Sequence, residues 1–373
     1  MKRRVLVALG WNAPRVLLAI GQHARASGWH LETRQFFTET VPARWRGDGM
    51  IVSNPQRADL LAFIRRQTPR QPTVLIGGNQ PGIRAAQVTE DNLAAGRLAA
   101  LHFIERGHRR FAWITAYGGP VSTDRARGFM QTVGAAGFAC ANLAYPNGRG
   151  SLADWLATEL RRLTRPTACY VLDDQLAADV IETALGLGWR VPEDLAVMGT
   201  GNIEIACECS LVPISSVELD EEEIGRRACA LLDRLMSGRK PPKAAIVIPP
   251  RGGVVRRSSD WLALTAPTLR RAVDFIHAGL HRPFSLEEAA TAAGVSRRTL
   301  YHLFRRELRR TPAEFVLQAR LARARDLLSD PARRIAETAG LCGFGSPRTL
   351  TRVFLRHEGV TPRAWRAGGG FKS

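Results

Sequence analysis

Short apolar runs alternate with stretches of helical periodicity over the first 260 residues of this 373-residue chain. An apolar run bounded by turn residues is typical of a buried strand, whereas apolar residues that recur every three or four positions predict a helix. Strands followed by helices predict a mostly parallel sheet with helices on both faces, whose ligands bind beyond the carboxyl ends of the strands. The predicted strands are Val5–Leu9, Gly49–Ser53, Thr73–Ile76, Phe111–Thr115, Cys169–Leu172 and Leu195–Gly199, and the predicted helices are Arg15–Ser27, Asp91–Arg106, Asp124–Ala136, Asp174–Leu187 and Glu221–Met236.

The alternation of strands and helices stops near residue 240. Glycine and proline residues interrupt the pattern from Gly238 onward, and the last apolar run, Ala245–Ile248, is followed by two prolines. Beyond Pro267 the periodic stretches are all helical, which indicates a separate all-α domain. We therefore expect an α/β domain at residues 1–258, a linker at 259–267 and a helical domain at 268–373.

An internal repeat runs through the helical domain. Its two copies are offset by 50 residues, or by 49 upstream of the turn, so the second copy has one residue more in its turn. A repeat of this length indicates a duplicated structural unit. The matching pairs are Ala290 and Ala339, Gly294 and Gly343, Ser296 and Ser346, Arg298-Thr299-Leu300 and Arg348-Thr349-Leu350, Phe304 and Phe354, Thr311 and Thr361, and Pro312 and Pro362.

Each copy has the features of a helix-turn-helix unit. A short apolar helix ends at Gly294 or Gly343, where a glycine suits the positive φ of a helix end. Ser296 or Ser346 then caps a second helix, whose apolar residues pack inward. Arginine and threonine near the start of such a helix read base edges in the major groove of DNA. The residues predicted to face outward are Arg297, Arg298, Tyr301 and His302 in the first copy and Arg348, Thr351 and Arg352 in the second.

The net charge of +19 favours a polyanionic partner, because each phosphate that a basic side chain neutralises releases counterions. Arginine supplies 49 of the 53 basic residues, a bias that genome composition also produces, so the distribution of charge carries more weight. Residues 267–373 carry a net charge of +11, against +8 for the first 266 residues. This density agrees with a DNA interface, although a solvated surface explains any single arginine equally well.

Other classes of protein find little support in the sequence. The six cysteines form no CxxC motif, and we interpret them as small buried thiols rather than a zinc site. The chain lacks GxGxxG, P-loop, GxSxG and HExxH motifs, so we expect no enzyme, metal or cofactor, and we interpret His23, His102 and His108 as surface residues. No apolar run approaches 18 residues, and the first strand is too short for a signal peptide, which predicts a cytoplasmic protein without membrane contact.

Residues 268–367 resemble the DNA-binding domain of the AraC/XylS family of regulators. The most specific motif is Gly343-Phe344-x-Ser346-x3-Leu350-x3-Phe354-x5-Val360-Thr361-Pro362-x2-Trp365-Arg366. The resemblance implies two recognition helices that are held by one linking helix and read successive major grooves. It also implies that Thr311 and Thr361 begin helices whose N–H groups hold phosphates, and that Arg298, Tyr301, His302, Arg348, Thr351 and Arg352 read bases.

The α/β domain resembles the sugar-sensing core of lac-repressor-type regulators, which has a two-lobed, periplasmic-binding-protein-like fold. The resemblance is carried by Asp48-Gly49-Met50-Ile51-Val52, by Arg125-x2-Gly128-Phe129 and by Val191-Pro192-Glu193-Asp194-Leu195. The usual N-terminal DNA-binding headpiece is absent, and the order of the two domains is similar to that of bacterial xylose-operon regulators. The resemblance implies a homodimer that binds operator DNA and a small effector, with RNA polymerase as a further partner.

The resemblance also implies a set of ligand-binding residues. Sugar-binding members use an arginine at the position of Arg125, a polar pair at Asp173-Asp174 and an aspartate where this chain has Gly201. Loss of that carboxylate argues against xylose, because charge-assisted hydrogen bonds are the stronger ones. Asn202 or Glu204 is a candidate substitute, and Trp11 is a candidate for stacking on a sugar or for packing at the hinge. Asp173-Asp174 is equally suited to cap the following helix.

Together these patterns predict a two-lobed α/β sensor domain, with parallel sheets and helices on both faces, followed by an all-α domain with two helix-turn-helix units. We expect a sequence-specific transcription factor whose DNA binding is modulated by a small ligand, and a sugar is the first candidate. Two alternatives stay open at this point. One is a regulator whose sensor domain has lost sugar binding or takes a different ligand. The other is an architectural protein that binds DNA without sequence choice, against which the distinct outward residues argue.

Overall fold

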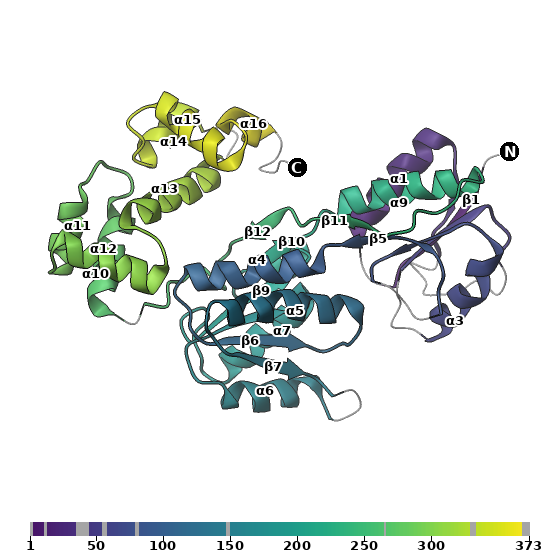
Figure 1. The fold of residues 1–373 in the computed structure, drawn as a ribbon, viewed down its shortest axis with the longest axis horizontal. Coiled ribbons are helices and arrows are strands. Elements are labelled where there is room, and N and C mark those ends of the chain that lie inside the picture. The colour runs from purple at the N-terminus through teal and green to yellow at the C-terminus, as the bar shows by residue number, and fades with distance from the viewer. Residues whose placement is uncertain are drawn as a thin grey trace. The chain divides into compact units, whose positions relative to one another are not determined.

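The computed structural model describes residues 3–10, 13–34, 45–53, 58–78, 82–146, 150–264, 266–328 and 333–367 (Figure 1). The chain divides into two compact units. The α/β unit comprises Met1–Ala100, Phe111–Thr164 and Cys169–Ser259, and the helical unit comprises Leu101–Arg110, Arg165–Ala168 and Asp260–Ser373.

The first of two sheets found among the described residues is a six-stranded parallel sheet with helices on both faces. Helices α1 (Pro14–Ser27) and α9 (Glu221–Met236) cover one face, where Val16 and Ile20 of α1 pack in one cluster with Ile224 of α9. Helix α3 (Ala58–Gln67), followed by the 3-10 turn η1 (Thr68–Arg70), packs on the other face. The strand order is β11 (Ile246–Ile248), β5 (Ala86–Glu90), β4 (Thr73–Ile76), β3 (Gly49–Ser53), β1 (Arg4–Ala8) and β2 (His30–Glu32).

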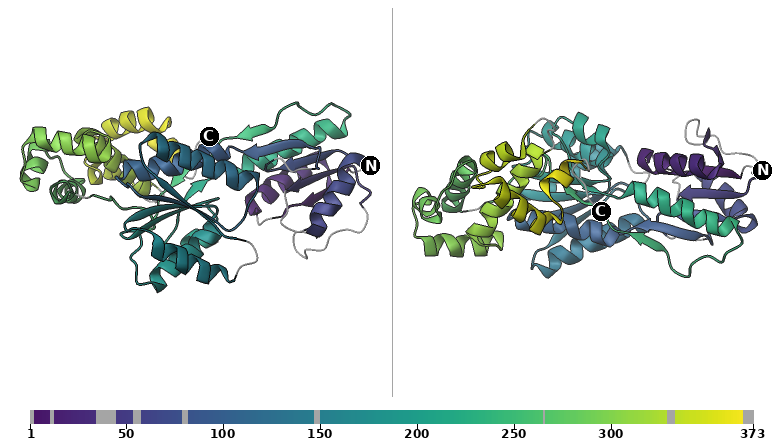
Figure 2. Two further views of the ribbon diagram at one scale, coloured as in Figure 1. Left: turned by 60° about the horizontal axis from the view of Figure 1, so that its bottom comes forward. Right: turned by 90° about the horizontal axis from the view of Figure 1, so that it is seen from above.

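The second sheet also has six strands, and Figure 2 shows its twist. Its core is aromatic: the Phe129 and Tyr170 rings lie 5.2 Å apart, as do those of Trp113 and Tyr170. The flanking helices are α4 (Asn92–Glu105), α5 (Pro120–Ala135), α6 (Leu152–Arg162), α7 (Asp174–Gly186) and the short α8 (Glu204–Cys209). The strand order is β12 (Gly252–Val254), β10 (Ser215–Glu218), β9 (Leu195–Thr200), β8 (Thr167–Val171), β6 (Phe111–Thr115) and β7 (Cys140–Ala144), with β12 antiparallel to β10.

Three described segments carry the chain from one sheet to the other: Glu90–Asn92, Glu218–Glu221 and Ile248–Gly252, which we call the crossover segments. They are hydrogen-bonded to one another. The Asp91 N–H donates to the Ile248 carbonyl at 2.8 Å, and the Arg251 N–H donates to the Glu218 carbonyl at 2.9 Å. Side chains from both lobes of the α/β unit therefore meet at one place.

In the described part of the helical unit after Asp260, every regular element is a helix. The helices pack as two clusters, and α13 (Pro312–Leu328) belongs to both. Its Phe315 packs with Leu300 and Phe304 in the first cluster, and its Leu321 packs in the second. The other helices are α10 (Pro267–Gly279), α11 (Leu286–Ala293), α12 (Arg297–Leu308), α14 (Ile335–Leu341), α15 (Pro347–Glu358) and α16 (Pro362–Ala367).

The predicted α/β and all-α fold classes are confirmed, while several details of the sequence interpretation are wrong. Strands β2, β5, β7, β10 and β12 were not predicted, because they are short or carry polar residues. Cys209 is exposed and Cys140 is only partly buried, so the thiols are not uniformly buried. His108 is 1% exposed rather than a surface residue, and burial lowers its pKa to about 3. No helix in the described part of the chain is long and apolar enough to span a bilayer.

Candidate DNA interface and ligand cleft

The first helix-turn-helix unit is formed by α11 and α12. Gly294 ends α11 with a φ of 72°, a left-handed conformation that a glycine adopts without strain. Ser296 then caps α12, and its hydroxyl accepts a hydrogen bond from the Thr299 N–H at 3.1 Å. The glycine end and the serine cap predicted from the sequence are therefore both present.

The outward face of α12 carries the residues that the sequence predicts to face DNA. Leu300, Phe304 and Leu308 are fully buried and fix the inward face. Arg297 forms an ion pair with Glu287 of α11 at 2.7 Å, and this pair anchors its guanidinium beside the turn. The exposed residues of the first two turns of α12 are Arg297, Arg298, Thr299, Tyr301 and His302, so all four predicted positions face outward.

The second unit, formed by α14 and α15, repeats this geometry. Gly343 has a φ of 68°, and the Ser346 hydroxyl accepts from the Thr349 N–H at 3.1 Å. Arg348 and Arg352 are exposed one turn apart on α15. Thr351 is half-buried, and its hydroxyl donates to the Pro347 carbonyl at 2.9 Å, which orients the side chain along the helix.

Two further helix starts lie next to these units. The Thr311 hydroxyl accepts from the Glu314 N–H at 3.2 Å, and the Glu314 carboxylate accepts in return from the Thr311 N–H at 2.7 Å. The Thr361 hydroxyl accepts from the Ala364 N–H at 3.2 Å. Both threonines are therefore N-caps, as the repeat predicts.

Helix α13 fixes the two units to one another. It contributes to both hydrophobic clusters, and Arg325 on α13 forms an ion pair with Glu358 at the end of α15 at 2.7 Å. The predicted linking helix is thus present, and it presents two capped helices with exposed arginines on one scaffold.

The sequence-predicted ligand residues lie in the α/β unit, except that Trp11 is outside the described residues. Arg125 on α5 is buried, and its guanidinium donates to Asn92 Oδ1 at 2.8 Å and to the Leu172 carbonyl at 2.6 Å. Helix α5 approaches α4 closely at Gly128, where any side chain would overlap the Leu93 carbonyl. Arg125 therefore joins a crossover segment to the end of β8.

Asp173, Asp174 and Asn202 lie beyond the carboxyl ends of β8 and β9. Asp173 caps α7, accepting from the Leu176 N–H at 2.8 Å. Asp174 is fully buried and accepts from the Ile203 N–H at 2.8 Å. Burial raises the pKa of the Asp174 carboxyl, and hydrogen bonds from Ser216 and Ile203 lower it in part. Asp173 thus serves the cap that the sequence left as an alternative, and Asp174 holds the turn that carries Asn202.

Gly201 stands where sugar-binding relatives are expected to have a carboxylate. Its φ of 120° lies in a region that other residues rarely adopt, and a Cβ there would lie 3.4 Å from Asp174 Oδ2. The turn is therefore shaped around glycine, and a side chain at this position is strained whatever its chemistry.

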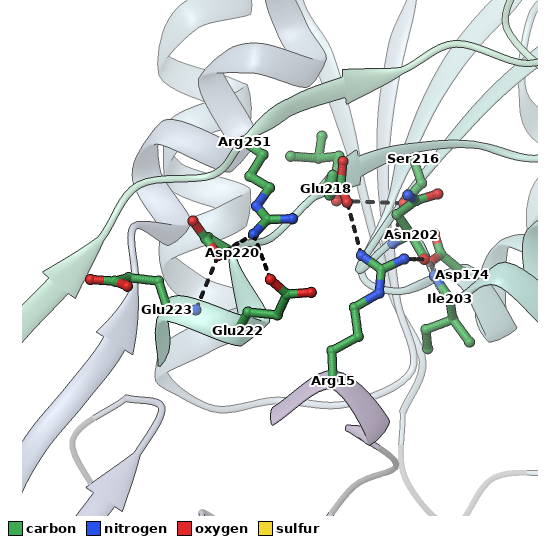
Figure 3. A network of polar contacts seen from close by, with 11 residues as sticks. Arg15, Asp174, Asn202, Ile203, Ser216, Glu218, Asp220, Glu222, Glu223 and Arg251 are labelled. Carbon is green, nitrogen blue, oxygen red and sulfur yellow. Dashed lines mark hydrogen bonds and ion pairs between the residues drawn. The ribbon is translucent and has the colours of Figure 1, made fainter. Parts of the chain in front are cut away.

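Sequence reasoning missed two charged residues that meet where the two lobes of the α/β unit join, Arg15 and Glu218 (Figure 3). Arg15 on α1 donates to Glu218 Oε1 at 2.8 Å and to the Asn202 carbonyl at 3.2 Å, so it connects the first lobe to the second. Glu218 is the last residue of β10 and only 2% exposed. Glu218 carries little signal in the sequence, because its strand reads Ser-Ser-Val-Glu and its partner lies 203 residues away in the sequence.

A second ion-pair group ties the crossover segments together (Figure 3). The Arg251 guanidinium lies 2.9 Å from Asp220 and 3.2 Å from Glu222. Asp220 also caps α9 by accepting from the Glu223 N–H at 3.1 Å. These contacts fix the crossover segments to one another. Among the described residues, no three His, Cys, Asp or Glu side chains lie close enough together to hold a metal ion.

Comparisons with protein families match both parts of the chain. A family described as a periplasmic binding protein-like domain matches residues 100–259, and one described as a helix-turn-helix domain matches residues 289–368. The chain therefore contains both kinds of domain, in the order in which the structure presents them.

Individual relatives match along nearly the whole length. The xylose operon regulatory protein of Escherichia coli (strain K12) is 29% identical over 98% of this chain and 97% of that protein. A solved structure of a xylose-binding transcription activator is 27% identical, covers 99% of this chain and 98% of the other, and has a TM-score of 0.59. A transcriptional regulator in complex with cellobiose, 22% identical over 69% of this chain and 85% of the other with a TM-score of 0.55, shares the fold of the α/β unit.

Proposed function

We propose that this chain, a DNA-binding transcription regulator with a periplasmic-binding-protein-like sensor domain and an AraC-type helix-turn-helix domain, changes its affinity for operator DNA when a small ligand enters the cleft of the sensor domain. The observation that carries the proposal is the duplicated, serine-capped helix with exposed arginines, joined in one chain to a two-lobed α/β unit.

The DNA-binding half of the proposal assigns roles to the outward residues. The two recognition helices enter successive major grooves, whose centres are about one helical turn, or roughly 34 Å, apart. Arginine suits guanine at these positions, since its fork matches the two acceptors of that base. The helix starts at Thr311 and Thr361 face phosphates. The proposed base-reading residues are Arg297, Arg298, Tyr301, His302, Arg348, Thr351 and Arg352.

The sensing half assigns the ligand site to the carboxyl ends of the strands, where Arg125, Asn202 and Glu218 lie beside the crossover segments. Relatives named for xylose and cellobiose support a sugar-like, polyhydroxylated ligand. The turn at Gly201 argues against the xylose contacts in particular, because its φ of 120° strains any residue with the expected carboxylate side chain.

The proposed assembly is a homodimer that acts on DNA in the cytoplasm, with RNA polymerase as a further partner. A dimer presents four recognition helices and so reads two half-sites, which lengthens the operator. Sedimentation of the purified protein, with and without operator DNA, tests this part: a monomer on a single half-site would contradict it.

Selection from a random DNA pool, at a stated salt concentration and with or without a panel of pentoses and hexoses, tests the function as a whole. We expect an enriched site with two contact blocks about one helical turn apart, whose affinity changes with one ligand. Enrichment without any ligand effect would contradict the sensing half. Tight binding without an enriched site would contradict sequence-specific regulation.

Two arginine variants sharpen this experiment. Arg298→Ala and Arg352→Ala should each lose about 1–3 kcal/mol of specific affinity and relax the choice of base in one contact block. The matched control is Arg227→Ala on α9 of the sensor domain, which removes the same charge outside the helical unit. A control that weakens specific binding as much as the two variants would show that net charge, not base contact, carries the affinity.

A further inference from the structure

The ligand cleft is acidic although the protein as a whole is strongly basic. Three carboxylates, Glu90, Glu218 and Glu221, lie close enough to interact electrostatically, together with the buried Asp174 and the guanidinium of Arg15. The net charge of the chain is +19, so this local excess of negative charge runs against the composition. Burial of like charges costs free energy, which a ligand of opposite charge would offset.

Two oxygen atoms of this cleft are buried without a hydrogen-bond partner. Glu218 uses Oε1 to accept from Arg15, but Oε2 of the same carboxylate has no hydrogen-bond donor among the residues that the structure describes. Asn202 is 7% exposed, and its side-chain Oδ1 likewise has no donor. An unpaired buried acceptor costs about 1–3 kcal/mol, and more when it is charged. Both atoms belong to residues that already contact Arg15 (Figure 3).

The unpaired atoms define what a ligand must supply. Both are acceptors, so the complementary group is a donor, and the surrounding carboxylates favour a positively charged one. A neutral hydroxyl donates only one hydrogen bond and brings no charge, whereas an ammonium donates three. A metal ion fits poorly, because the described residues place no three suitable ligands around one point.

We propose that the effector is a polyhydroxylated amine, such as an amino sugar, whose protonated amino group is bound by Glu218 Oε2 and Asn202 Oδ1. This assignment rests on the proposed ligand site and narrows its chemistry from sugars in general to amine-bearing ones. Arg15 keeps its bond to Glu218 Oε1 and orients the carboxylate, so that the free oxygen faces the amino group.

Calorimetric titration of the full chain with matched neutral and amino compounds tests the assignment. The panel consists of several hexoses, the corresponding 2-amino sugars and their N-acetyl derivatives, which keep the ring but lose the charge. We expect one amino sugar to bind at least about tenfold more tightly than its neutral and N-acetyl counterparts. Glu218→Gln should bring the affinities for the amino sugar and its neutral counterpart to within about threefold of each other, because the preference depends on the charge of the carboxylate.

Glu223→Gln is the matched control. It removes the same charge from α9, where Glu223 pairs with Arg226 and Arg227, and should leave the preference unchanged. Equal or tighter binding of the neutral sugars would overturn the proposal, as would a preference that survives Glu218→Gln. If no amine binds while a DNA site is still enriched and still responds to another ligand, the amine assignment fails and the regulatory function stands. If neither a ligand nor a DNA site is found, the regulatory function fails as well.

Discussion

At the scale of single residues, Glu221 is a largely buried acid whose ionised form lowers the stability of the fold. Burial raises the pKa of Glu221 to about 7; the charge of Arg15 opposes this shift, and nearby Glu90, Asp174 and Glu218 add to it. Because the folded pKa lies above the unfolded value, the folded state binds the proton more tightly. The cost of the ionised group is fully present above pH 7 and is relieved as the pH falls toward about 4.5.

Glu221→Gln should therefore stabilise the protein at high pH and have little effect at low pH. We expect its free energy of unfolding to exceed that of the wild type by on the order of 2 kcal/mol at pH 8, with the difference shrinking toward pH 5. Urea unfolding between pH 5 and pH 8.5 measures this. Glu223→Gln, from the same helix, should show no such trend, and a constant difference for Glu221→Gln would contradict the assigned cause.

Gly201 offers a second test at this scale. Its backbone conformation, rather than a lack of space for a side chain, explains why a glycine stands there. Gly201→Ala should lower the free energy of unfolding by about 1–3 kcal/mol, since a φ of 120° is strained for alanine. Gly186→Ala in α7, where nothing lies within 4 Å, should instead raise it by about 0.5–1 kcal/mol. If urea unfolding shows the two variants behaving alike, backbone strain at Gly201 is not the reason for its glycine.

At the scale of elements, the sequence predicts what local chemistry determines. The helices α1, α7 and α9 match their predicted bounds within one residue, because an apolar stripe, an aspartate N-cap on α7 and α9, and the first-turn proline of α1 are local signals. Strand β10, Ser215–Glu218, was missed as a strand because its serines and glutamate look polar. They are nonetheless buried, since Ser215 bonds to Ser258 and Arg256, and Glu218 pairs with Arg15. Its burial depends on partners that are distant in sequence, which no local pattern contains.

The serine caps give a prediction for the recognition helices. Ser296→Ala and Ser346→Ala each remove a side-chain acceptor from the first turn of α12 or α15 and should cost about 1 kcal/mol of stability. DNA affinity should fall too, because the first turn carries Arg298 or Arg348. Thermal unfolding and DNA binding measure the two effects. Ser285 caps α11, which is not a recognition helix, so Ser285→Ala should lower stability by a similar amount with less effect on DNA affinity. Equal losses of DNA affinity in all three variants would contradict the assignment of α12 as a recognition helix.

At the scale of the whole molecule, both domain types were predictable from the sequence, but only some of the candidate ligand residues were. Arg125, Asp173, Asp174 and Asn202 were named from the resemblance to sugar-sensing regulators. Arg15 and Glu218 required the three-dimensional structure, because they come from different lobes and meet only after the chain has crossed between the sheets. The same long-range assembly makes the Arg15–Glu218 pair a link between the lobes, and thus a contact that any ligand of the cleft must accommodate.

Coupling between cleft and DNA interface gives the last prediction. If a ligand changes the affinity for operator DNA by some factor, operator DNA must change the affinity for that ligand by the same factor, commonly about 5- to 150-fold. Titrating the ligand with and without saturating operator measures both sides of this relation. Arg298→Ala should weaken DNA binding and leave ligand affinity in the absence of DNA unchanged, because the substitution lies in the helical unit. A factor of one on both sides would mean that ligand and DNA are not coupled, and the ligand would then have to affect transcription by some route other than the strength of DNA binding.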